Sequence, residues 1–291
     1  MPELSIVIVN YNTREALRRC LESIQAQRSE LDLEVIVVDN ASNDGSADMI
    51  RATMPDAKVI EPGHNTWFSG GNNLGAAQAS SEYVFILNPD TIIQPNTLTL
   101  MLDYLRAHPS VGAVTCQLRG LDHTLQFTCS HVPRYGDLLL TYTFLGLLLS
   151  PLRDHYTARM WYTGWQRDST RAVEVAPGSC IMARRTLYER IGGFDETLKL
   201  YYTEDDLCKR MLATGCEIHF VADVLLLHEE HVSTRHMQSA ARHIYFDDML
   251  IFCSKHYGAL PALMLRLLTM PTLWLMELKQ RQASRKQKIS V

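Results

Sequence analysis

Three short polar segments carry side chains suited to chemistry, and each directly follows an apolar run: Asn10-Tyr11-Asn12, Asp39-Asn40-Ala41-Ser42 and Asn88-Pro89-Asp90. A carboxylate such as Asp39 or Asp90 accepts hydrogen bonds from a ribose or a base, or binds a hard cation through oxygen. The residues after Asp39 are also turn formers, so a turn alone is a second explanation for that aspartate. If both aspartates lie at one edge of one sheet, they predict a diphosphate site that binds Mg²⁺ or Mn²⁺.

A glycine-rich segment, Ser69-Gly70-Gly71-Asn72-Asn73, opens an expected helix. Backbone N–H groups at such a helix start can approach a phosphate or a sugar closely. Paired glycines also mark helix boundaries where no ligand binds, so the segment by itself leaves both interpretations open.

An acidic segment, Thr203-Glu204-Asp205-Asp206, opens another expected helix. In a catalytic interpretation, one of these carboxylates is a general base that takes the proton from an attacking hydroxyl. In a structural interpretation, Thr203 caps the helix and the acids pair with Lys209 and Arg210 one turn later.

His228 follows an aliphatic run that ends at Leu227. It is either a core histidine bonded to a backbone carbonyl or a neutral imidazole that completes a metal site. His231, three residues later, is the rival candidate.

The elements that must position these residues alternate between strand and helix in the first half of the chain. Apolar runs predict strands over 4–9, 33–39, 58–60 and 83–87, and helical spacing or glycine boundaries predict helices over 14–27, 46–53 and 70–80. This β-α-β-α-β order predicts a parallel, doubly wound sheet. Ligands bind beyond the carboxyl ends of the strands in such sheets, which is where the three polar segments lie.

The second half is more mixed. We expect strands over 111–118, 178–183, 216–221 and 224–227, a helix over 204–214 closed by Gly215, and a long helix over 236–256. No internal repeat or low-complexity linker interrupts the chain, so a single domain with a C-terminal extension is the simplest organisation.

Composition excludes several classes of protein. The chain is 46% hydrophobic and 21% charged, as folded globular proteins are, and its net charge of -4 argues against nucleic acid as a partner. Seven scattered cysteines favour reduced thiols in the cytoplasm. The N-terminus lacks the basic region of a signal peptide, and no apolar stretch reaches the length of a spanning helix.

The C-terminal extension combines an apolar segment, Ala259 to Leu278, with a basic tail. That combination favours binding to the surface of an anionic membrane. A core or dimer helix followed by a frayed tail is the alternative. A second apolar segment, Leu138 to Leu152, joins the first on the membrane or is an ordinary buried helix.

Six motifs occur in a fixed order: SIVIVNYN, EVIVVDNASNDGS, FSGGNNLGAA, YVFILNPDT, GSCIMARRTLYERIGGFDE and YYTEDDLCKRMLATG. Together they resemble the inverting family-2 glycosyltransferases, and within them the bacterial rhamnosyltransferase-like branch that builds cell-surface polysaccharide. The resemblance implies an α/β GT-A fold, with a Rossmann-like, mostly parallel central sheet flanked by helices. It implies a domain over 1–257, with a nucleotide-binding half to about 118 and an acceptor half from about 119, before the extension at 258–291.

The resemblance also implies roles for individual residues. A nucleoside pocket would be formed by Asn10, Tyr11, Asn12, Asp39, Asn40 and Ser42. The diphosphate and donor sugar would lie along Gly70, Gly71, Asn72, Asn73, Asn88, Gly178 and Ser179. Asp90, in the place of the family's DxD motif, and His228 would hold Mg²⁺ or Mn²⁺. The base would be Asp205 or Glu204, and the alignment of the acidic motif leaves that choice open.

Two departures from the family pattern stand out. Asn88 replaces the first aspartate of DxD, which that branch tolerates, and Trp67 replaces the usual glycine before Phe68, which reshapes the sugar pocket. The resemblance implies a single displacement with inversion from a dTDP- or UDP-sugar. The implied acceptor is a glycan on a polyprenyl diphosphate at the inner face of the cytoplasmic membrane.

Two other functions remain as alternatives. A nucleotidyltransferase would need a basic, glycine-rich loop near the N-terminus, which residues 10–20 do not contain. A catalytically inactive nucleotide-sugar-binding scaffold would have lost Asp90 or the acidic helix start, and both are present.

Overall fold

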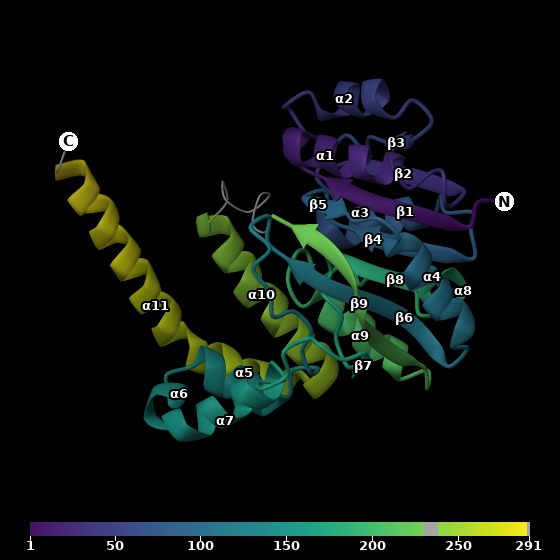
Figure 1. Ribbon diagram of the computed structural model, residues 1–291. Helices are drawn as coiled ribbons and strands as arrows, with labels where there is room; N and C mark the ends of the chain where they lie inside the picture. Colours follow the sequence, from purple (N-terminus) through teal and green to yellow (C-terminus); the bar gives the residue numbers. More distant parts are fainter. Residues whose placement is uncertain (230–237, 290–291) are drawn as a thin grey trace.

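The computed structural model describes the backbone of residues 1–229 and 238–289, and the side chains of residues 1–229 and 241–274 (Figure 1). Within these residues one sheet contains the strands β1 (Leu4–Asn10), β2 (Leu33–Asp39), β3 (Lys58–Ile60), β4 (Tyr83–Leu87), β5 (Thr91–Ile93), β6 (Val111–Arg119), β7 (Arg171–Val173), β8 (Cys180–Arg184) and β9 (Glu217–His228). The helices are α1 (Arg14–Gln25), α2 (Ser46–Thr53), α3 (Trp67–Ala76), α4 (Thr97–Ala107), α5 (Tyr135–Tyr142), α6 (Leu145–Leu148), α7 (Ser150–Met160), α8 (Arg185–Arg190), α9 (Thr203–Leu212), α10 (Gln238–Tyr257) and α11 (Ala259–Ile289).

The sheet has the strand order β3-β2-β1-β4-β8-β6-β9-β5, with β7 beside β9. The strands β3, β2, β1 and β4 are parallel, as the alternating pattern of the first half predicts. The second half adds antiparallel pairs, because β8 runs against β4 and β6, and β5 and β7 run against β9. The predicted α/β class is confirmed.

Helices cover both faces of the sheet. Side chains of α1, α2 and α4 pack on one face, and side chains of α3, α8 and α9 pack on the other. The strands β1, β2 and β4 are buried on both faces, which explains why their sequences are almost continuously aliphatic.

Helix α3 lies unusually close to β1 because its glycines have no side chain. A Cβ at Gly71 would stand 2.8 Å from Cγ1 of Val9, and one at Gly75 would stand 2.4 Å from Cγ1 of Val7. These separations are shorter than carbon atoms can tolerate, so only glycine allows α3 to pack here. The close packing places the start of α3 at the carboxyl edge of the sheet.

Several predicted boundaries are wrong. The helix expected over 70–80 begins earlier, at Trp67, and ends at Ala76. The two strands expected over 216–221 and 224–227 are one strand, β9, because β6 pairs first with Val221 and next with Leu225, and the residues between them bulge out of the register. The patterns did not predict the short strands β5 and β7, or the helices α4, α7 and α8. Residues 236–237 of the expected long helix lie outside the described residues.

The C-terminal helices form a third cluster beside the sheet. Phe252 and Cys253 of α10 pack with Leu138 of α5 and Leu265 of α11. The later turns of α11 extend away from the other elements (Figure 1). No helix within residues 1–229 and 238–289 has an apolar stretch long enough to cross a membrane.

Candidate active site

The carboxyl ends of β1, β2 and β4, the start of β8 and the carboxyl end of β9 meet at one edge of the sheet. Asn10 pairs with Asp39 across β1 and β2, and Leu87, the last residue of β4, pairs with Cys180, the first of β8. Thr91, directly after Asp90, pairs with His228. The register therefore brings the polar segments of the sequence to one edge.

The nucleoside end of this edge is built around Asp39. Its Oδ1 accepts hydrogen bonds from Asn10 Nδ2 (2.8 Å) and from the Ser42 hydroxyl. The backbone N–H of Asn12 donates to the same hydroxyl (2.9 Å). Asp39 Oδ2 has no hydrogen-bond partner among the described residues. An oriented carboxylate with one remaining acceptor oxygen suits a ribose hydroxyl or a base N–H. Tyr11 is half-buried beside these residues.

Asn40 connects this end of the edge to α3. Its Oδ1 accepts from the Thr66 backbone N–H (3.0 Å) and hydroxyl (2.6 Å), and its Nδ2 donates to the Trp67 carbonyl (3.0 Å). Both ends of the amide are thus used inside the protein, so Asn40 positions the turn before α3. Sequence reasoning missed Thr66, which no motif marks.

Asp90 and His228 form a pair at the other end of the edge. His228 Nε2 lies 3.4 Å from Asp90 Oδ1. Gln126 fixes the imidazole, because its Oε1 lies 3.0 Å from His228 Nδ1 and its Nε2 donates to the His228 carbonyl (2.8 Å). When the proton is on Nδ1, it donates to Gln126 Oε1, and the lone pair of Nε2 is directed toward Asp90. This is the tautomer that binds a metal through Nε2. No sequence pattern marked Gln126.

This pair fits a divalent cation. Asp90 Oδ1 is buried and has no hydrogen-bond partner, a costly state that a cation at this oxygen would relieve. Within the described residues no group of three or more His, Cys, Asp or Glu side chains is placed to hold a metal. Two protein ligands match a site in which substrate phosphates complete the coordination of Mg²⁺. His231, the rival ligand, lies outside the described residues.

The segment before β8 lies between the two ends. The Ser179 carbonyl accepts from the Asn88 N–H (3.2 Å), which joins the β4 end to this segment. A Cβ at Gly178 would stand 3.2 Å from Cζ of Phe68 and 3.6 Å from the carboxyl carbon of Glu204. Because Gly178 has no side chain, both Phe68 of α3 and Glu204 of α9 can lie close to its backbone.

The glycine-rich segment lies inside α3 rather than before it. Gly70 and Gly71 are buried, and Gly71 serves the packing on Val9 described above. Asn72 Nδ2 donates to the Phe68 carbonyl (2.9 Å), and its Oδ1 is buried without a partner.

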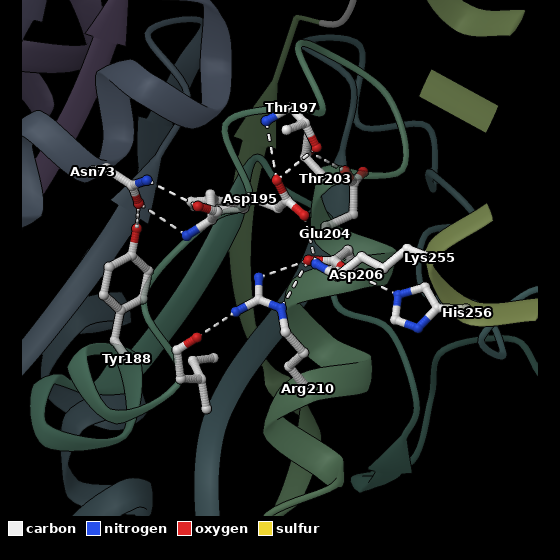
Figure 2. A network of polar contacts seen from close by, with 12 residues as sticks. Asn73, Tyr188, Asp195, Thr197, Thr203, Glu204, Asp206, Arg210, Lys255 and His256 are labelled. Atoms are coloured by element: carbon white, nitrogen blue, oxygen red, sulfur yellow. Dashed lines mark hydrogen bonds and ion pairs between the residues drawn. The ribbon is translucent and has the colours of Figure 1, made fainter. Parts of the chain in front are cut away.

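Asn73 is bonded within the protein. Its Nδ2 donates to the Phe194 carbonyl (2.9 Å), and its Oδ1 accepts from the Tyr188 hydroxyl (2.9 Å) and the Phe194 N–H (2.9 Å) (Figure 2). These bonds tie α3 to the segment before α9, so contact between Asn73 and a donor stays a prediction.

The three acids of α9 differ in their surroundings. The Asp206 side chain is 0% exposed and lies between Arg210, Lys255 and His256 (Figure 2). Burial by itself would raise its pKa, but the hydrogen bonds of His256 and Lys255 and the charge of Arg210 hold the pKa below its usual range. Asp206 is therefore a structural anion that fastens α10 to α9.

Glu204 and Asp205 lack such cationic partners among the described residues. Burial, followed by the charge of Glu204, raises the pKa of the Asp205 carboxyl well above its usual value. A carboxylate with a raised pKa is a stronger base. Glu204 and Asp205 therefore both remain candidates for the base, whereas the ion-paired Asp206 does not.

The chain belongs to glycosyl transferase family 2, whose model matches residues 5–192. It is therefore a glycosyltransferase enzyme, as the ordered motifs predict. One relative is the N-acetylglucosaminyl-diphospho-decaprenol L-rhamnosyltransferase of Mycobacterium tuberculosis (strain CDC 1551 / Oshkosh), 25% identical over 246 residues that cover 79% of this chain and 77% of the relative. Another is the rhamnosyltransferase WbbL of Escherichia coli (strain K12), 23% identical over 81% of this chain and 87% of the relative. The predicted resemblance to the rhamnosyltransferase-like branch is confirmed.

A solved structure supports the fold. The mannosyltransferase PcManGT of Pyrobaculum calidifontis, solved with GDP-Man and Mn²⁺, superposes with a TM-score of 0.58 at 21% identity. The match covers 89% of this chain and 65% of the solved chain, so this chain spans a little under two thirds of that protein's length. The predicted GT-A fold is confirmed.

Proposed function

We propose that the protein transfers a sugar, with inversion, from a dTDP- or UDP-sugar to an acceptor hydroxyl. One observation carries this proposal: Asp39, the pair of Asp90 and His228, and the two uncompensated acids of α9 are brought to the same edge of the sheet. These groups match a nucleoside, a metal-bound diphosphate and a reacting hydroxyl, in that order.

Asp90 Oδ1 and His228 Nε2 are the atoms that would hold Mg²⁺ or Mn²⁺. A bound ion would neutralise the negative charge that develops on the departing diphosphate. Asp90 and His228 would contribute a pair of ligands at the sheet edge, and Gln126 orients the imidazole of the pair. Mn²⁺ in the solved mannosyltransferase supports a divalent ion here.

Asp205 or Glu204 accepts the proton of the acceptor hydroxyl. The acceptor oxygen forms a bond to the anomeric carbon while the bond from that carbon to the phosphate oxygen breaks, and the nucleoside diphosphate leaves with the electron pair. A single displacement of this kind inverts the anomeric centre. The raised pKa of Asp205 favours it as the base.

We propose rhamnose as the sugar and a glycan on a polyprenyl diphosphate as the acceptor. Two relatives are rhamnosyltransferases, and one of them carries an N-acetylglucosaminyl-diphospho-decaprenol in its name. We further propose that the activity belongs to cell-surface polysaccharide synthesis at the inner face of the cytoplasmic membrane.

An anionic membrane surface is the partner we propose for α11. The helix has two apolar stripes, and the stripe with Leu265 packs on α5 and α10. The other stripe is exposed and repeats at helical spacing, with these members: Leu260, Leu263, Met264, Leu267, Met270 and Trp274. Leu147 and Leu148 of α6 are also exposed, and α6 contacts α5, against which α11 packs. The basic tail adds charge complementary to an anionic bilayer.

Vesicle sedimentation tests this membrane contact. The variant Leu263→Glu with Leu267→Glu should lose binding to vesicles of phosphatidylglycerol and phosphatidylcholine, because two charges enter the exposed stripe. Leu100→Glu on α4, where the leucine is 47% exposed, is the matched control and should bind like the wild type. Equal binding by both variants would exclude the stripe as the docking surface.

Donor hydrolysis and thermal shift test the transferase activity, with UDP-, dTDP- and GDP-sugars and with or without Mn²⁺ or Mg²⁺. We expect one nucleotide class to stabilise the wild type only with metal, and Asp90→Ala to lose that shift. Asp48→Ala is the matched control, since the Asp48 side chain is 94% exposed on α2. Metal-dependent binding without transfer would favour the catalytically inactive scaffold. No metal-dependent shift with any nucleotide would exclude the Asp90 site.

A further inference from the structure

Trp67 has a backbone conformation that tryptophan rarely adopts. Its φ is +61°, in the left-handed region that favours glycine. A bulky side chain kept in such a conformation indicates that the side chain has a use beyond folding.

Three backbone hydrogen bonds hold this conformation of Trp67. The Trp67 N–H donates to Asn65 Oδ1 (2.8 Å), and its carbonyl accepts from Asn40 Nδ2 (3.0 Å). The next N–H, that of Phe68, donates to the Lys199 carbonyl (3.0 Å). The peptide units on both sides of Trp67 are thus bonded, so its side chain leaves the backbone in a defined direction.

Lys199 also contacts the indole ring. Its Nζ lies 5.4 Å from the centroid of the Trp67 ring, a cation–π contact. Asp248, a buried residue of α10, accepts the backbone N–H groups of Lys199 (3.2 Å), Leu200 (2.9 Å) and Tyr201 (2.9 Å). The segment that carries Lys199 is therefore itself fixed.

The backbone of Trp67 lies between the nucleoside residues and the acidic helix α9. On one side its carbonyl is bound by Asn40, the neighbour of the nucleoside residue Asp39. On the other side the ring of the next residue, Phe68, lies against Gly178, which also lies beside the Glu204 carboxyl. Trp67 is half-buried, and its backbone lies between residues that the proposed function gives to the nucleoside and to the reacting hydroxyl. The donor's sugar joins these two parts of the substrates.

We propose, on the basis of the proposed function, that Trp67 selects the donor sugar by packing its indole against the apolar face of the pyranose. Lys199 is a positioning residue that holds the ring. A sugar with an apolar C–H face gains contact with an aromatic ring, and a deoxysugar such as rhamnose gains more because a methyl group replaces a hydroxyl.

Calorimetry of donor binding tests the inference with wild type, Trp67→Gly, Trp67→Phe and Lys199→Met in the presence of Mn²⁺. The readout is the contribution of the sugar, namely the Kd of dTDP divided by the Kd of dTDP-rhamnose. Trp67→Gly should reduce this ratio roughly three- to tenfold and leave the Kd of dTDP unchanged. Trp67→Phe should retain most of the ratio, and Lys199→Met should lower it partly.

Trp67→Gly is expected to fold, because glycine adopts the observed φ without strain. An unchanged ratio in Trp67→Gly would overturn the inference while leaving the transferase intact. Sugar transfer by the wild type is measured separately, so binding without transfer would contradict only the proposed catalysis. The absence of any nucleotide binding by the wild type would overturn both.

Discussion

Replacing Asp206 by asparagine should strongly destabilise the fold. The carboxylate is fully buried, and it accepts from Arg210 Nε (2.8 Å) and from His256 Nε2 (2.8 Å), while Lys255 Nζ lies 2.7 Å away. Asparagine removes the negative charge and leaves Arg210 and Lys255 facing a neutral amide. Breaking a buried ion pair by removing one partner costs about 3–5 kcal/mol.

Urea unfolding at pH 7 measures this loss, with Asp103→Asn as the control. Asp103 makes an exposed pair with Arg106 at 3.4 Å, so its loss should cost no more than about 1 kcal/mol. A difference of less than about 1 kcal/mol between the two variants would refute the assignment of Asp206 as the anion that fastens α10 to α9.

The pH dependence gives an independent check with a definite sign. The pKa of Asp206 is lowered in the folded state, so the unfolded state binds the proton more tightly. Its stabilisation is complete above the unfolded pKa of about 3.9 and disappears as the pH falls through the lower folded pKa. The stability gap between wild type and Asp206→Asn should therefore be constant near neutrality and narrow below about pH 4. A constant gap at acid pH would contradict the charge-based explanation.

Three further predictions concern packing, the base and the metal pair. Gly71→Ala should lower the free energy of unfolding by about 1–3 kcal/mol, because its methyl group would stand 2.8 Å from Cγ1 of Val9; urea unfolding measures this. Asp205→Asn should reduce kcat roughly 10²–10⁴-fold but raise the thermal midpoint near neutral pH, because burial disfavours the charged carboxylate. Gln126→Leu should weaken Mn²⁺ binding about 10- to 100-fold by releasing His228, which a titration in the presence of nucleotide measures.

Each of these predictions has an opposing result. An unaffected unfolding curve for the alanine variant would mean that α3 can move away from β1. The wild-type rate should rise with pH as Asp205 loses its proton, and a flat profile would point to Glu204. Unchanged Mn²⁺ affinity in the leucine variant would remove the glutamine from the metal site.

Local patterns were enough to predict where the sheet edge lies. Continuous aliphatic runs predict strands that are buried on both faces, and a polar residue directly after such a run has to emerge at a strand end. Asp39 and Asp90 were found in this way, because both the run and the residue that ends it are contiguous in sequence. The error at β9 has the same origin, because the bulge over residues 222–224 resembles the end of a strand in the sequence pattern.

The roles of particular side chains depended on partners that are distant in the chain. The acids of α9 are adjacent in sequence, and the approach of Lys255 and His256 from α10 distinguishes Asp206 from its neighbours. Gln126 carries no local signal, because its contact with His228 spans 102 residues. The sequence by itself determined the order of the elements and the residues at their ends, since local periodicity controls both. The tertiary structure decided which charges are compensated, because compensation depends on distances that only the folded chain sets.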